Sequence, residues 1–130
     1  MLFVAADHLN AISQNGMRPL DLVLLNLQVG ERAVHVSAFI PAAAYLRKGL
    51  DSLTTQVTRP WQDHYDITIR MYRAAADVEL CLGHFGKGHE LCRVIMQQAQ
   101  STSDKLVTSL SLGEALGRQE RHVEAMKVHQ

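Results

Sequence analysis

The sequence predicts an all-α protein in which antiparallel helical hairpins stack as a right-handed solenoid of about seven helices. Alanine and leucine are abundant, whereas aromatic residues make up only 5% of the 130 residues, which favours helix over sheet. Apolar residues recur at helical spacing along most of the chain, and no segment alternates convincingly as a strand. Small residues recur in pairs at a constant spacing, which is typical of helices that pack closely against each other.

Turn residues and prolines set the expected helix boundaries. Asn15 and Gly16 form a turn signal that ends a leading helix. Pro19, Pro41 and Pro60 each fit the first turn of a helix, because a proline in a helix interior would break it. The expected helices cover approximately residues 2–13, 19–36, 41–53, 60–82, 86–100, 104–117 and 120–129.

Two further breaks divide the second half of the chain. A tight turn is expected at residues 83–86, which begin and end with glycine. Residues 101–104 are rich in side chains that cap helices, and Gly117 is expected to end the helix that follows. Trp61 and Tyr65 are one helical turn apart, and we interpret them as a packing cluster rather than a ligand site.

The two members of each small-residue pair are twelve positions apart, with an aromatic residue or a histidine between them. This arrangement resembles the tetratricopeptide (TPR) pattern, in which small residues on both helices of a hairpin allow the backbones to come close. The repeat divides a single domain of residues 1–130 into a leading helix over 1–15 and TPR-like units at about 19–55, 60–100 and 103–130. The pairs are Gly30 with Ala42, Ala76 with Gly88, and Gly113 with Ala125.

Composition and charge argue against several classes of function. The 13 basic residues are balanced by 13 acidic ones, so we expect neither a nucleic-acid partner nor a membrane partner. The N-terminal apolar run is too short for a secretory signal, and no stretch approaches the ~20 apolar residues that span a bilayer. Two cysteines make no disulfide framework, and we expect both to be buried in the helices of a reduced, cytoplasmic protein.

A set of segments that together span nearly the whole chain carries a resemblance to a known class of protein: HLN at residues 8–10, NLQVGERA at 26–33, SAFIPAAAYLRKGLDSL at 37–53, Trp61 with Tyr65, AAADVELCLGHF at 74–85 and RHVEAMKVH at 121–129. Together they resemble the helical region that follows the NTPase module in large signalling ATPases. Those multidomain proteins often carry a Ser/Thr kinase-like domain in front of this region and sensor or histidine-kinase domains behind it.

The resemblance implies a regulatory, TPR-like protein-interaction segment rather than the catalytic part of an ATPase or kinase. The chain has no GxxxxGK motif followed by Ser or Thr, and no HRD or DFG motif, so ATP binding is assigned to no residue. We therefore expect no enzyme activity, no catalytic residue and no cofactor in this chain. We expect it to be a fragment of a longer protein, with an NTPase or kinase domain of the same polypeptide, or a separate protein, as its partner.

Two alternatives stay open. Cys81, His84, His89 and Cys92 have ligand-like spacing about the turn, so a small zinc-stabilised helical domain is the minority interpretation. The chain could also be a fragment of an ATPase or kinase enzyme whose active site lies outside it. The glycines of residues 83–88 are interpreted as turn and packing residues rather than a phosphate loop, because no Ser or Thr follows the lysine.

A partner groove is expected on the concave face, which stacked hairpins form from the first helix of each unit. Arg70 and Arg73 are about one turn apart on this face and could take a carboxylate of the partner. The alternative for this face is a solvated helix surface. The residues expected to line the groove are Gln28, Glu31, His35, Arg70, Arg73, Asp77, Ser111 and Glu114.

Overall fold

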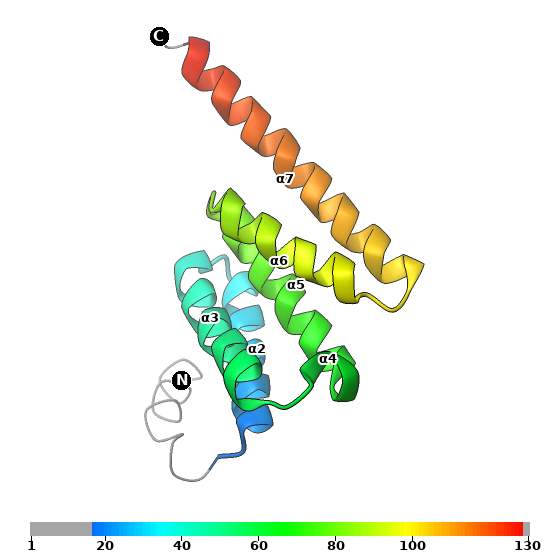
Figure 1. The fold of residues 1–130 in the computed structure, drawn as a ribbon. Coiled ribbons are helices and arrows are strands. Elements are labelled where there is room, and N and C mark those ends of the chain that lie inside the picture. Colours follow the sequence, from blue (N-terminus) through cyan, green and yellow to red (C-terminus); the bar gives the residue numbers. More distant parts are fainter. Residues whose placement is uncertain (1–16, 129–130) are drawn as a thin grey trace.

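The protein is all-helical over the residues that the structure describes. The computed structural model describes residues 17–128, with side chains up to residue 121, and holds no strand in that range. The all-α prediction is therefore confirmed, whereas the leading helix predicted over residues 1–15 lies outside the described residues. The described helices are α2 (Pro19–His35), α3 (Phe39–Gln56), α4 (Pro60–Asp63), α5 (Tyr65–Cys81), α6 (Phe85–Gln98) and α7 (Thr102–Val128) (Figure 1).

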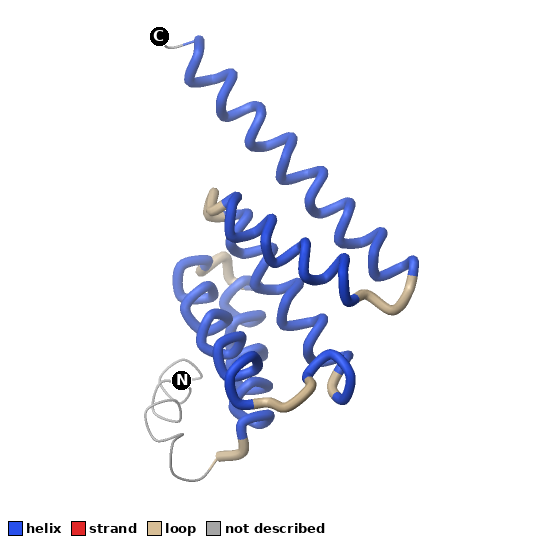
Figure 2. The backbone as a smooth tube through the Cα atoms, viewed as in Figure 1, coloured by secondary structure: helices blue, strands red, loops and turns tan. Residues whose placement is uncertain are grey.

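Helix α5 is the centre of the structure, because it contacts every other described helix. The α2–α3 hairpin packs along one side of it, and α6 and α7 follow on the other side (Figure 2). The core between these helices contains large, fully buried side chains, each of which stabilises the fold by about 1.5–3 kcal/mol relative to exposure. They include Leu27, Leu46, Leu53, Met71 and Ile95.

The hairpins predicted for the first two units are present as α2–α3 and α5–α6, and they turn in the same way. Each first helix ends in a Schellman motif, in which one residue is left-handed and the next amide bonds back to a carbonyl five residues earlier. The left-handed residue is Gly83 (φ 81°) after α5 and Ser37 (φ 60°) after α2. The closing hydrogen bonds run from the amide of His84 to the carbonyl of Glu79 and from Ala38 to Ala33, each 2.8 Å long.

Glycine allows close approach within both hairpins, but it faces a leucine rather than the other small residue of its predicted pair. A Cβ atom on Gly30 would lie 2.6 Å from Cγ of Leu46, and one on Gly88 would lie 2.5 Å from Cγ of Leu80. Both distances are well below the ~3.5–4.0 Å of favourable carbon–carbon contact. Sequence reasoning missed a third close approach at Gly49, where the added Cβ would lie 2.5 Å from a methionine of α5.

The third predicted hairpin is absent, which corrects the prediction of separate helices over 104–117 and 120–129. Residues 102–128 form one helix, α7, which continues through Gly117 without a turn. An interior glycine costs only about 1 kcal/mol relative to alanine, and its neighbours in the sequence are strong helix formers. Gly113 was predicted at a close crossing, but no side chain or neighbouring helix among the described residues comes within 4 Å of where its Cβ would be. A continuing solenoid therefore stays a prediction.

The helix predicted over residues 60–82 is divided at His64. This residue adopts φ −138° and ψ 50°, outside the helical region, so that α4 ends before it and α5 begins after it. The buried side chain of Thr68 holds the kink, because its hydroxyl donates a 3.0 Å hydrogen bond to the carbonyl of Pro60. The break changes the direction of the chain where it enters the central helix.

Trp61 packs beneath this kink. Its ring centroid lies 5.9 Å from that of Tyr65 and 5.1 Å from that of Tyr72, and only 8% of Trp61 is exposed. Tilted aromatic pairs at these separations stabilise a core beyond the area that they bury. The predicted packing cluster of Trp61 and Tyr65 is therefore confirmed, with Tyr72 as a further member.

Helix α7 extends beyond the other helices. Its N-terminal part lies beside α6, while its C-terminal part points away from the other helices (Figure 1). Thr108 and Ala115 are buried, whereas Leu106, Leu110 and Leu116 are 57%, 64% and 48% exposed. Despite its 27 residues, α7 is too polar to cross a membrane, and no other helix in the described part of the chain is long and apolar enough to do so.

Candidate partner groove

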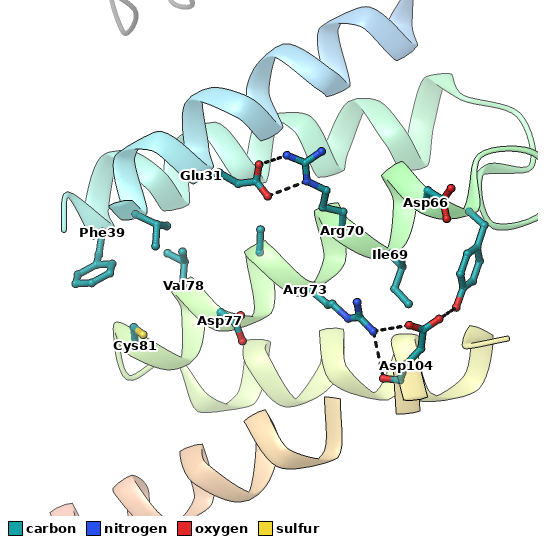
Figure 3. A pocket seen from close by; sticks show the side chains of 13 residues that line it. Glu31, Phe39, Asp66, Ile69, Arg70, Arg73, Asp77, Val78, Cys81 and Asp104 are labelled. Carbon is teal, nitrogen blue, oxygen red and sulfur yellow. Dashed lines mark hydrogen bonds and ion pairs between the residues drawn. The ribbon is translucent and has the colours of Figure 1, made fainter. Parts of the chain in front are cut away.

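A groove runs along α5, between α2 and the beginning of α7. It encloses about 570 Å³, within the ~300–1,000 Å³ that is usual for ligand sites. Helix α5 supplies most of the lining, and Figure 3 shows Phe39 and Cys81 at one end and Asp66 and Asp104 at the other. The apolar and aromatic residues of the lining are Val34, Phe39, Tyr65, Ile69, Ala74 and Val78.

Arg70 of α5 and Glu31 of α2 form a bidentate ion pair on one side of the groove (Figure 3). Nε of Arg70 donates to Oε2 of Glu31 at 3.0 Å, and Nη2 donates to Oε1 at 2.5 Å. The hydrogen bonds to Glu31 raise the pKa of Arg70, so the guanidinium stays charged. Two parallel bonds fix the orientation of both groups, and the pair ties α2 to α5.

Asp104, in the first turn of α7, joins α7 to α5. Its carboxylate accepts hydrogen bonds from the hydroxyl of Tyr65 (2.6 Å) and from Nη2 of Arg73 (2.9 Å). The bond from Tyr65, followed by that from Arg73, holds the pKa of the Asp104 carboxyl below its ordinary value. Ser101 caps the helix by accepting the amide of Asp104 at 3.1 Å. The predicted cap-rich break is thus the point at which α7 is fixed to the groove.

Two carboxylates of the groove remain unpaired. Within the described side chains, no hydrogen bond or ion pair holds Asp66 or Asp77, and both reach solvent. Partial removal from water in the groove raises the pKa of Asp77; the charges of Arg118 and Arg73 oppose this rise, and that of Glu114 adds to it. Asp77 is therefore an acceptor whose charge the chain itself does not fully neutralise.

Half of the residues predicted to line the groove do so. Gln28 and His35 are exposed on α2 outside it. Ser111 borders a separate cavity of about 30 Å³ between α5, α6 and α7, and Glu114 is exposed on α7. The predicted residues that line the groove are Glu31, Arg70, Arg73 and Asp77.

The structure does not favour the suggestion that Arg70 and Arg73 receive a carboxylate of the partner. Each guanidinium already binds a carboxylate of this chain, Glu31 in one case and Asp104 in the other. Nε of Arg73 has no hydrogen-bond acceptor, but it is shielded from solvent. Sequence reasoning also missed Tyr65 as a lining residue, because its contact with Asp104 joins positions 39 residues apart.

The four residues with zinc-like spacing do not come together. Among the described residues, no group of three or more histidine, cysteine, aspartate or glutamate side chains is placed to hold a metal ion. His84 lies 3.4 Å from a buried carboxylate, and the ring of His89 packs beside that of Phe85. Cys92 is buried as predicted, but Cys81 is exposed, which corrects the expectation that both thiols are buried. As the last residue of α5, Cys81 lines the end of the groove instead.

Comparisons with known proteins do not assign the chain to a family. The sequence matches no protein-family model and no curated protein, and the structure matches no solved structure. Function is therefore inferred from the groove and its charges.

Proposed function

We propose that the chain is a non-catalytic helical module that binds a segment of protein in the groove between α2, α5 and α7. The observation that carries this proposal is the combination of apolar and charged lining in one elongated hollow. Ala74 of α5, Val34 of α2 and Phe39 of α3 offer apolar surface. Ile69 and Val78 also line the groove but are buried, with 5% and 1% exposed. Grooves of this type accept the apolar face of an amphipathic helix, while polar groups on the walls select its register.

The two walls are held in place by interactions within the chain. The Arg70–Glu31 ion pair fixes α2, and the hydrogen bonds of Asp104 fix the beginning of α7. A site that is ordered before binding loses less conformational entropy when its partner arrives. This preorganisation supports a groove that receives a short segment without a large change in the fold.

The resemblance to the helical region of signalling ATPases gives the proposal a biological setting. In that setting the partner is an NTPase or kinase domain of the same polypeptide, or a separate protein, and the role of the module is regulatory. The volume of the groove, about 570 Å³, fits a few side chains of such a partner. The proposed contact is therefore a projecting helix or loop rather than a whole domain surface.

A peptide selection tests this function. A phage-displayed library of random peptides is selected on the immobilised chain, and the enriched peptides are measured by fluorescence anisotropy. Ala74→Trp fills the groove, because Ala74 lines it on α5. The matched control is Ala44→Trp, at an exposed position of α3 that does not line the groove.

We expect Ala74→Trp to lower the affinity for the enriched peptides by tenfold or more. Ala44→Trp should leave this affinity unchanged. Circular dichroism and thermal unfolding check that both variants are folded. If Ala74→Trp is unstable, Val34→Trp blocks the same groove from α2, where Val34 is 36% exposed. Peptides that bind the blocked and control variants equally well would overturn the proposed function.

A further inference from the structure

We propose that the bound segment is cationic and apolar: a peptide or helix that carries lysine or arginine among apolar side chains, with Asp77 and Asp66 receiving its positive charge. This inference rests on the proposed function, because it specifies the partner of the same groove. It reverses the preference that the two arginines of α5 indicate in the sequence alone.

The charged side chains that line the groove are unbalanced in favour of carboxylates. Four carboxylates line the groove against two guanidinium groups. Each guanidinium is bound to one of these carboxylates, which leaves two carboxylates without an ion pair in the described part of the chain. The groove therefore offers unpaired negative charge to a partner, and complementary potential favours a cation there. The carboxylates are Glu31, Asp66, Asp77 and Asp104.

An acidic partner would have to compete with ion pairs that the two arginines already make. To bind a carboxylate through Arg70, the groove would have to break the two hydrogen bonds to Glu31 and leave that carboxylate unpaired. The same exchange at Arg73 would release Asp104 and with it one attachment of α7. An acidic partner would replace one carboxylate by another, whereas a basic partner adds an ion pair without breaking any.

Asp77 has apolar neighbours on the groove side of α5. Ala74 and Cys81 lie three and four residues from Asp77 on the same helix, and both line the groove. Residues at this spacing are neighbours on a helix surface. A lysine or arginine could therefore lay its methylene stem along them while its charged head reaches the carboxylate. The partial removal of Asp77 from water, which raises its pKa, adds to the gain from a cationic ligand.

The composition and charge dependence of the selected peptides test this inference. Peptides enriched on the wild-type chain and blocked by Ala74→Trp should contain lysine or arginine within an apolar sequence. Replacing that basic residue by glutamate should weaken binding by tenfold or more. Raising the salt concentration should also weaken the basic peptide, because exposed ion pairs are screened.

Variants of the groove identify the carboxylates involved. Asp77→Asn and Asp66→Asn should each lower the affinity for the basic peptide by about fivefold, which is the upper end of the effect expected for a partly exposed ion pair. Asp51→Asn, at an exposed position of α3 outside the groove, is the matched control and should change affinity less than twofold. Asp77→Lys should restore binding of the glutamate-substituted peptide, a rescue that a merely structural role of Asp77 would not produce.

The outcomes separate this inference from the proposed function. Enrichment of acidic or uncharged peptides that still depend on Ala74 would overturn the cationic preference and leave the groove as the binding site. If Asp77→Asn and Asp66→Asn both bind the basic peptide as tightly as the wild type, the cationic preference is overturned and the groove remains the binding site. Loss of all dependence on Ala74 would instead overturn the proposed function.

Discussion

The carboxylate of Glu79 accepts a 2.6 Å hydrogen bond from Nη2 of Arg47, which joins α5 to α3. Only 2% of the Glu79 side chain is exposed, and Nζ of Lys87 (3.3 Å) and Nδ1 of His84 (3.4 Å) approach the same carboxylate. Burial by itself raises the pKa of Glu79, but the hydrogen bonds, that from Arg47 first, outweigh it and hold the pKa below its ordinary value. This cluster connects the two hairpins.

Replacing Arg47 by methionine should therefore destabilise the protein. The substitution keeps an apolar stem but leaves the buried Glu79 with weaker partners, and a charged hydrogen bond of this kind stabilises by about 1–3 kcal/mol. The exposure of Arg47, 43% of its side chain, places the expected loss toward the lower end. Urea unfolding at neutral pH measures it. Arg18→Met is the control, because Arg18 is 85% exposed beside Asp21, and a loss as large as that of Arg47→Met would contradict this prediction.

The free energy of unfolding should decrease as the pH is lowered, and protonation of Glu79 should account for part of this decrease. Because the folded pKa of Glu79 lies below the ordinary value of 4.5, its contribution is present above that value and is lost as the pH falls through the folded pKa. Glu79→Gln should flatten the decrease of the unfolding free energy below about pH 5. Some decrease should remain, because the pKa of Asp104 is also lowered. Parallel acid curves for wild type and Glu79→Gln would show that Glu79 is not a source of the pH dependence.

Replacement by alanine should change the stability of the protein in opposite directions at two glycines, Gly88 and Gly113. In Gly88→Ala the new Cβ would meet the buried side chain of Leu80, and overpacking costs about 1–3 kcal/mol, partly offset by the ~1 kcal/mol gain in helix propensity. In Gly113→Ala the new methyl meets nothing within 4 Å, so the variant should gain about 0.5–1 kcal/mol. Thermal unfolding measures both changes. Stabilisation by Gly88→Ala would mean that α5 and α6 are not closely packed there.

Cys81 and Cys92 should differ in reactivity. Cys81 is exposed at the end of the groove, whereas burial, followed by the charge of Asp77, raises the pKa of the Cys92 thiol. Iodoacetamide should therefore alkylate Cys81 first and Cys92 more slowly by a factor on the order of 100, because Cys92 reacts only when the fold opens. Mass spectrometry of digested protein follows each site. Cys81→Ser should abolish only the fast reaction, and similar rates at both thiols would contradict their placement.

Local signals in the sequence predicted much of the fold. Pro41 lies in the first turn of α3, as a helical proline must, and Gly83 takes the left-handed conformation that ends α5. The same reasoning failed at Gly117, because a glycine inside a helix costs little when nothing else favours a turn. It also failed at His64, where the hydrogen bond from Thr68 to Pro60 breaks a segment with an otherwise helical pattern.

The groove was predicted only in part, because its geometry depends on long-range contacts. Helical periodicity placed Arg70, Arg73 and Asp77 on one face of α5, but it did not reveal that both arginines are already paired. The partners come from α2 and α7, at distances along the chain that no repeat pattern specifies. Sequence reasoning therefore placed these three residues on one helix face but could not identify the partners of the two arginines.

The most direct test of the binding groove is a ¹⁵N–¹H correlation spectrum of the chain, recorded during titration with the tightest peptide from the selection. The groove predicts that the largest shifts occur at the amides of Arg70, Ala74, Asp77 and Val78, with little change around the exposed Ala44 of α3. The result that would contradict it is a peptide that binds but shifts mainly the amides of α3, or those beside the exposed leucines of α7, while the groove residues keep their positions.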